Sequence, residues 1–166
     1  MKREKLLHNL SHIVLIVFIV AQIVLSFVLY NQNGTPVVRN IGYALLWISA
    51  ILGWLPIITF KKKGEIKKGE SFVKTNKLVD TGVYAIVRHP QFLGGMLLAV
   101  SLILISQNWI VGLIAIPNIV IFYLAIIDGD REGIKKFGQD YKDYMKKVPR
   151  INVVLGLIRF LSKNNK

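Results

Sequence analysis

Four long apolar runs dominate the pattern of hydrophobic and polar positions along the chain. They cover residues 13–30, 41–60, 92–105 and 109–127, and none of them contains Asp, Glu, Lys, Arg or His. A membrane-spanning helix needs about 20 apolar residues, within a range of roughly 17–25, and the first, second and fourth runs reach that length. Buried helices of a soluble protein are the alternative, but four uncharged runs leave no polar faces for water. The pattern predicts an all-α integral membrane protein.

The third run is shorter, and Pro90 marks the start of its helix. Proline favours the first helical position because its missing N–H would be unpaired there anyway. A helix over 90–106 would be about 25 Å long, which is less than the hydrocarbon thickness of roughly 30 Å. We therefore predict a single membrane domain with spans at about 13–30, 41–60, 90–106 and 109–127. The short third span would draw Arg88 and His89 into the membrane interface.

The basic residues indicate the orientation of these helices. Of the 22 Lys and Arg residues, only Arg39 lies between the first two runs, and none lies between the third and the fourth. Cytoplasmic loops are the ones enriched in Lys and Arg, so both termini are expected in the cytoplasm, which requires an even number of spans. A cytoplasmic loop at 61–89 and a cytoplasmic or interfacial segment at 128–166 complete the predicted multi-pass topology.

Composition narrows the function classes. The chain has no cysteine, which excludes disulfides and thiolate chemistry. His8 and His12 are too few ligands for a metal site, and we expect no metal.

Transporters usually carry ionisable residues at mid-membrane, whereas these spans offer only Gln22, Asn118 and hydroxyl groups. The net charge of +13 suits anionic membrane lipids, and basic residues scattered around membrane entries argue against nucleic acid. The oligomeric state is left open.

Polar residues follow the fourth span, and apolar positions then recur at helical spacing over 134–148. This pattern predicts an amphipathic helix lying on the membrane. The apolar stretch 151–161 is too short to span the membrane, and we expect it to dock instead of crossing. Asp128, Asp130 and Glu132 stand where the fourth span leaves the membrane, at the level expected for Arg88 and His89. Solvation of a helix end is the alternative explanation for these acidic residues.

Two sequence motifs carry a resemblance to a known group of enzymes. The stretch LVDTGVYAIVRHPQFLGG at 78–95 resembles the signature of the membrane methyltransferases that include isoprenylcysteine carboxyl methyltransferase and the phospholipid N-methyltransferases. The acidic cluster followed by FGQDYKDYMKKVPR at 137–150 resembles their C-terminal tail. The order of the motifs and the intervening helical hairpin also match, so the resemblance covers about 78–150.

The resemblance implies a methyltransferase that uses S-adenosylmethionine, releases S-adenosylhomocysteine and lacks a Rossmann domain, with its active site facing the cytoplasm. Arg88 and His89 are the implied catalytic residues and suit the carboxylate of the cofactor. Asp130 and Glu132 suit its ammonium and ribose, and aromatic walls suit its adenine. The full implied cofactor set is Gly82, Tyr84, Arg88, His89, Pro90, Gly94, Asp130, Glu132, Tyr141 and Tyr144.

Two features depart from the family pattern. Phe92 stands where tyrosine is common, and the acidic pair appears as Asp130-Arg131-Glu132. Gly94 and Gly95 allow either close helix packing or room for a ligand.

The methyl acceptor is expected to be lipophilic and to enter from the bilayer. An isoprenylcysteine carboxylate needs only orientation, and it is favoured because no base stands clearly apart from the cofactor set. The alternative is the amine of a phospholipid such as phosphatidylethanolamine, which requires a general base. A non-enzymatic membrane scaffold or lipid-binding protein is the alternative from another class.

Overall fold

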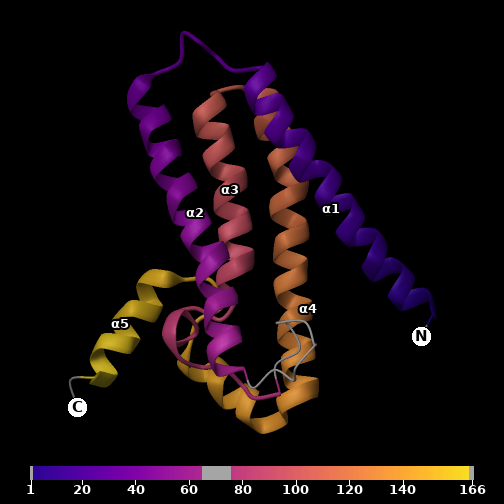
Figure 1. Ribbon diagram of the computed structural model, residues 1–166, viewed down its shortest axis with the longest axis vertical. Helices are drawn as coiled ribbons and strands as arrows, with labels where there is room; N and C mark the ends of the chain where they lie inside the picture. The colour runs from indigo at the N-terminus through magenta and orange to yellow at the C-terminus, as the bar shows by residue number, and fades with distance from the viewer. Residues whose placement is uncertain (1, 65–75, 165–166) are drawn as a thin grey trace. The chain divides into compact units, whose positions relative to one another are not determined.

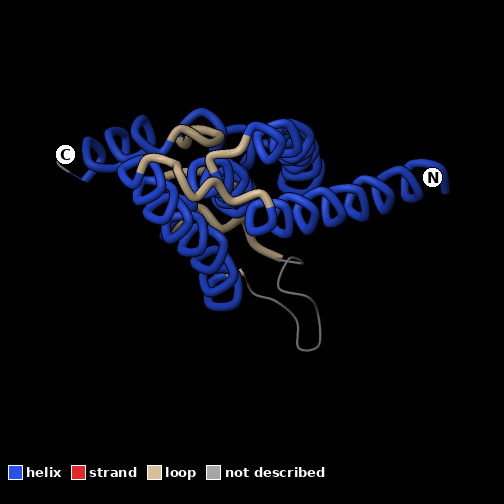
Figure 2. Tube along the Cα trace, turned by 90° about the horizontal axis from the view of Figure 1, so that it is seen from above, coloured by secondary structure: helices blue, strands red, loops and turns tan. Residues whose placement is uncertain are grey.

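The computed structural model describes residues 2–64 and 76–164, and side chains over 13–64 and 76–162. Helices and connecting segments make up this part of the chain, which contains no strand (Figures 1 and 2). The elements are α1 (Lys2–Val28), α2 (Pro36–Lys63), the 3₁₀ helix η1 (Gly82–Ala85), α3 (Pro90–Ser106), α4 (Trp109–Lys147) and α5 (Val153–Asn164). The predicted all-α fold is confirmed. Residues 65–75 of the predicted loop, and the side chains of His8 and His12, lie outside what is described.

The chain forms two compact units. Unit 1 comprises 1–50 and 95–124, and unit 2 comprises 51–94 and 125–166. Two helices, α2 and α4, are long and apolar enough to cross a membrane, while 13–28 and α3 are shorter apolar helices. The helix predicted over 90–106 has the predicted bounds. The four-span topology with both termini in the cytoplasm remains a prediction.

Unit 1 exposes large apolar side chains and buries two amide side chains. Trp47 and Trp109 are each 73% exposed and Phe27 is 76% exposed, whereas Gln22 and Asn118 are fully buried. The Gln22 Nε2 donates to the Ala99 carbonyl at 2.9 Å, and Asn118 Nδ2 donates to Gln22 Oε1 at 2.8 Å. This arrangement suits a hydrocarbon solvent, because buried amides need partners while exposed apolar side chains do not.

The helices of unit 1 approach closely at Gly95. A Cβ on this residue would overlap the ring of Phe122, so the glycine lets α3 and α4 pack against each other. Close helix packing is therefore the role of Gly95 that the structure supports.

In unit 2, α4 continues well beyond the predicted end of the fourth span at 127 and bends at Gly138. That residue has φ 57° and ψ −124°, a conformation that residues with a side chain rarely adopt. The bend turns the last part of α4 back, so that Tyr141, Tyr144 and Val148 form a buried core cluster. The expectation that the apolar face of 134–148 lies on the membrane is thus wrong, because this face is buried within unit 2.

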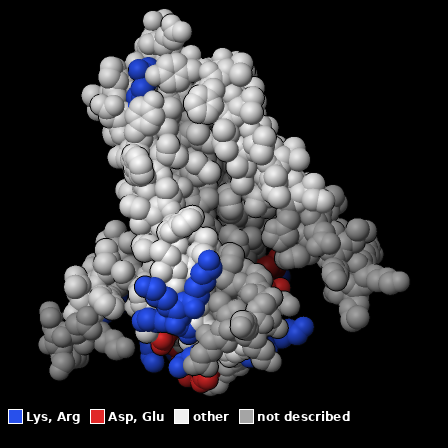
Figure 3. Space-filling model, in the orientation of Figure 1, with Lys and Arg blue, Asp and Glu red and all other residues white. Residues whose placement is uncertain are grey.

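Charged side chains gather in unit 2. Among the described side chains of unit 1, Arg39 is the one that carries a full charge. In Figure 3 the Lys and Arg side chains gather over the end of α2 and the last part of α4. This is the face that the distribution of basic residues assigns to the cytoplasm.

Candidate functional site

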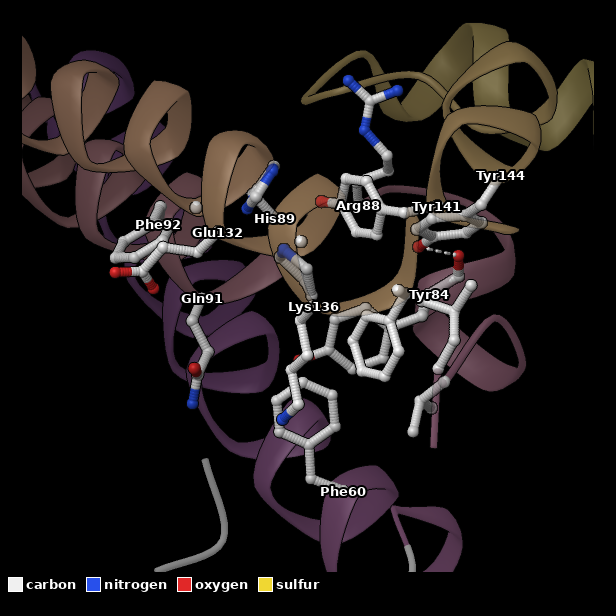
Figure 4. Close-up of a pocket in the computed structure, with 16 residues that line it drawn as sticks. Phe60, Tyr84, Arg88, His89, Gln91, Phe92, Glu132, Lys136, Tyr141 and Tyr144 are labelled. Atoms are coloured by element: carbon white, nitrogen blue, oxygen red, sulfur yellow. Dashed lines mark hydrogen bonds between the residues drawn. The ribbon is translucent and has the colours of Figure 1, made fainter. Parts of the chain in front are cut away.

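A cavity of about 300 Å³ lies within unit 2. Its wall combines residues from the end of α2, from the segment between η1 and α3, and from the last part of α4. In Figure 4, Phe60 and the tyrosines lie on one side, and Gln91, Phe92 and Glu132 on another. The lining residues are Phe60, Leu78, Val79, Tyr84, Arg88, His89, Pro90, Gln91, Phe92, Gly129, Glu132, Gly133, Lys136, Phe137, Tyr141 and Tyr144.

Asp130 organises the charged groups beside this cavity. Its Oδ1 accepts hydrogen bonds from His89 Nε2 at 2.8 Å and from the Tyr141 hydroxyl at 3.0 Å. Its Oδ2 accepts from Arg88 Nη2 at 3.1 Å and from Arg150 Nε at 2.9 Å. Because a carboxylate only accepts, the His89 proton in this bond lies on Nε2. Four donors fill the usual accepting positions of the carboxylate.

The surroundings of Asp130 keep it ionised. Burial alone raises its pKa, but the hydrogen bond from His89 and the charges of His89 and Arg88 outweigh burial and hold the pKa well below its usual range. Two guanidinium groups face this one carboxylate. The cluster therefore carries a net positive charge beside the cavity.

Arg88 joins the two sequence motifs. Its Nη1 donates to the carbonyls of Met145 and Val148, both at 2.9 Å, and so occupies carbonyls that the end of α4 would otherwise leave unpaired. The backbone N–H of Arg88 donates to the Pro149 carbonyl at 3.1 Å, and that of His89 to the Arg150 carbonyl at 3.3 Å. The RHP segment is thereby held against the VPR segment.

Aromatic rings form the apolar part of the wall. Phe60 stacks on Tyr84, with ring centroids 4.6 Å apart and planes 8° from parallel. The Tyr144 hydroxyl donates to the Tyr84 carbonyl at 2.7 Å, and Tyr141 meets Tyr144 edge to face. Burial raises the pKa of Tyr84, Tyr141 and Tyr144 above the usual range. These phenols are therefore neutral at physiological pH.

Two glycines of α4 allow the close approach of site residues. A Cβ on Gly133 would overlap the ring of Tyr141, and a Cβ on Gly129 would press on the imidazole of His89. Gly82 has φ 64° and opens η1, the 3₁₀ turn that carries Tyr84.

The structure brings most of the expected site residues together. Tyr84, Arg88, His89, Pro90, Glu132, Tyr141 and Tyr144 line the cavity. Asp130 stands behind them, bonded to three of the lining residues. Gly82 supports the turn, and Gly94 is not among the residues of the wall.

Several residues of the cavity wall, and Arg150 beside it, were missed by the sequence reasoning. Phe60 lies at the end of an apolar run, where nothing distinguishes a site residue from a lipid-facing one. Lys136 and Phe137 were assigned to an interfacial helix, and Arg150 was seen only as part of a motif. The helical spacing of Gly129, Glu132, Gly133 and Lys136 is the signal that would have grouped them on one face.

Residues 37–137 match the model of a known family, described as phospholipid methyltransferase. The match covers more than half of the chain and includes the RHP segment and the acidic cluster. The chain belongs to the phospholipid methyltransferase family. This confirms the resemblance drawn from the two motifs. No match was found among curated proteins or among solved structures.

Membership of the phospholipid methyltransferase family implies a methyl donor, for which S-adenosylmethionine is the expected cofactor. The cavity volume lies at the lower end of the range of ligand pockets, about 300–1,000 Å³. The stacked pair of Phe60 and Tyr84 suits an adenine ring, and the net positive cluster around Asp130 suits a carboxylate. Glu132 on the wall suits an ammonium or a ribose diol. The residues present therefore fit the cofactor.

Proposed function

We propose that this protein methylates the amine of a membrane phospholipid, with S-adenosylmethionine as the methyl donor. The observation that carries the proposal is the cavity in unit 2, whose wall is built from both family motifs and includes a carboxylate. When bound, S-adenosylmethionine supplies a methyl group on a sulfonium, which a neutral amine attacks without a metal. The protein must orient the acceptor, exclude water and remove a proton.

Glu132 is the residue we assign to proton removal. A phosphoethanolamine ammonium must lose a proton before its nitrogen can attack, so an amine acceptor requires a general base. Asp130 accepts four hydrogen bonds and is unsuited to that role. Glu132 is exposed on the cavity wall and makes no hydrogen bond or ion pair within the described part of the chain. It can therefore accept a proton from the acceptor.

The second candidate is an isoprenylcysteine carboxylate as the acceptor. Lys136 on the cavity wall favours it, because an ammonium can orient a carboxylate without removing a proton. The two candidates differ in the bond that is formed, an N-methyl in one case and a methyl ester in the other.

Binding of the donor is tested first, by calorimetric titration of the purified protein with S-adenosylhomocysteine. We expect binding in the micromolar range. Absence of binding to folded protein would contradict the proposal and favour a non-enzymatic lipid-binding protein.

The acceptor is tested by incubating the protein with total lipid extract and cofactor labelled in the methyl group. Alkali releases volatile methanol from a methyl ester and leaves an N-methyl amine intact. We expect label that resists alkali and migrates with a phospholipid. Label released as methanol would contradict the amine acceptor and support the carboxylate.

A further inference from the structure

The polar side of helix α5 holds it against the rest of unit 2. Asn152 caps its first turn, where the Asn152 Oδ1 accepts from the Leu155 N–H at 3.0 Å. Gly156 is buried, and a Cβ there would overlap the Ile86 carbonyl. Arg159 Nη1 lies 3.4 Å from the carbonyls of Lys146 and Lys147. In the view of Figure 1, α5 leads outward from the level of the lower part of α2 to the C-terminus.

The opposite side of α5 is apolar and exposed. Val154 is 69% exposed, Leu157 41%, Ile158 60% and Leu161 59%. At 3.6 residues per turn these four side chains fall within an arc of roughly 100°. A surface helix of a water-soluble domain turns its apolar stripe to the core. Here the orientation is reversed, so the described part of the chain leaves this apolar face without a cover.

Two observations identify that cover as a membrane surface. Within the same unit, α2 also exposes apolar side chains, with Trp54 67% and Ile51 53% exposed, and α2 is long and apolar enough to span a bilayer. After Asp143 the sequence contains no acidic residue and six basic ones. An apolar face among basic residues is the composition that binds anionic lipid surfaces.

The residues that hold α5 in place are close in sequence to residues of the site. Ile86, the contact of Gly156, lies two residues before Arg88. Pro149 and Arg150, whose carbonyls accept from the Arg88 and His89 amides, lie just before α5. An interaction that keeps α5 packed against Ile86 therefore also stabilises the two backbone segments, 88–89 and 149–150, that pair with each other.

We infer that α5 lies on the anionic membrane surface with its apolar face in the lipid, and that this contact stabilises the pairing of Arg88 and His89 with 149–150. If lipid binds α5 only when the helix is packed against Ile86, the lipid shifts the equilibrium by mass action toward the state in which 88–89 and 149–150 are paired. The inference concerns a binding surface outside the cavity and stands independently of the methyl acceptor.

The lipid contact is tested with single cysteines, which is straightforward because the chain has none of its own. Ile158→Cys and the control Asp140→Cys, on the exposed polar side of α4, carry an environment-sensitive fluorophore in nanodiscs of phosphatidylcholine and phosphatidylglycerol. We expect bromine atoms on the lipid chains to quench the probe at 158 several-fold more than the probe at 140, and aqueous iodide to do the reverse. Equal iodide quenching at both sites would overturn the lipid contact. So would a probe at 158 that neither agent reaches, because a protein would then cover this face.

The link to the site is tested by hydrogen exchange of the Arg88 and His89 amides, without any cofactor. Ile158→Asp in the same nanodiscs should speed their exchange several-fold, whereas Ser162→Asp, also exposed on α5 but outside the arc, should not. Both positions are exposed, so neither variant disturbs a core. Unchanged exchange in Ile158→Asp would overturn the coupling, even if the lipid contact itself held.

Discussion

At the scale of single residues, the contacts of Asp130 favour a positioning role over direct cofactor binding. Its carboxylate is 5% exposed and bonded to Arg88, His89, Arg150 and Tyr141. A buried ion pair is costly to break because the remaining charge is left unpaired. Asp130 thus aligns side chains from both motifs, and the cavity wall depends on it.

We predict that Asp130→Asn destabilises the protein by about 3–5 kcal/mol near neutral pH. The folded pKa lies below the unfolded value of about 3.9. The stabilisation from this carboxylate is therefore full well above pH 4 and declines as the pH falls below it. Thermal unfolding in detergent at several pH values should show the variant's deficit shrinking in acid.

Asp128→Asn is the matched control. Asp128 pairs with Arg131 on the surface, with the two side chains 59% and 75% exposed, and such pairs contribute at most about 1 kcal/mol. A deficit of Asp130→Asn that stays constant from pH 7 to pH 3 would contradict the ionised role of Asp130.

Glu132→Gln tests the assignment of the base. We predict that kcat with an amine acceptor, measured at a saturating concentration of S-adenosylmethionine, falls about 100-fold or more. Saturation with the donor separates this loss from any weaker binding of the cofactor's ammonium or ribose. An unchanged kcat with a phospholipid amine would remove Glu132 from the chemistry.

At the scale of elements, Gly95 and Gly112 both lie in apolar helices of unit 1 but differ in their surroundings. A Cβ at Gly95 would overlap Phe122, whereas at Gly112 the nearest atom is Ile103 Cγ2 at 4.0 Å. We predict that Gly95→Ala destabilises the protein by about 1–3 kcal/mol through overpacking. Gly112→Ala should stabilise it by up to about 1 kcal/mol, because alanine loses less backbone entropy.

Thermal unfolding of both variants in one detergent checks this pair of opposite signs. Gly95→Ala combined with Phe122→Leu should recover part of the loss, since the smaller side chain makes room for the added methyl group. A tolerated Gly95→Ala would mean that α3 and α4 are not in close contact at this point.

At the scale of the whole molecule, the distribution of basic residues predicts four spans with both termini in the cytoplasm. Three spans separate residue 32 from residue 140, and four separate residue 9 from residue 140. In sealed vesicles, a membrane-impermeant maleimide should label Asn9→Cys and Asp140→Cys from the same side and Gln32→Cys from the other. Labelling of Gln32→Cys and Asp140→Cys from one side would rule out the predicted topology.

Local patterns were sufficient for much of this molecule. Uncharged apolar runs predicted helices because a buried backbone must pair with itself, and Pro90 marked the start of α3 at its observed position. The two motifs, read together, led to the family that the match over 37–137 shows. The site residues predicted from them include seven of the sixteen residues that line the cavity, because their side chains are of the kinds that a charged cofactor requires.

Only the tertiary structure decided how those residues are used. Helical spacing over 134–148 defined an apolar face but not what covers it, and the bend at Gly138 buries that face within unit 2 instead of on the membrane. Asp130 and Glu132 look equivalent in the sequence, yet one accepts four hydrogen bonds and the other lies open on the wall. The partners of a side chain come from segments distant in sequence, so spacing along the chain determines what a face can bind, and the fold determines what it meets.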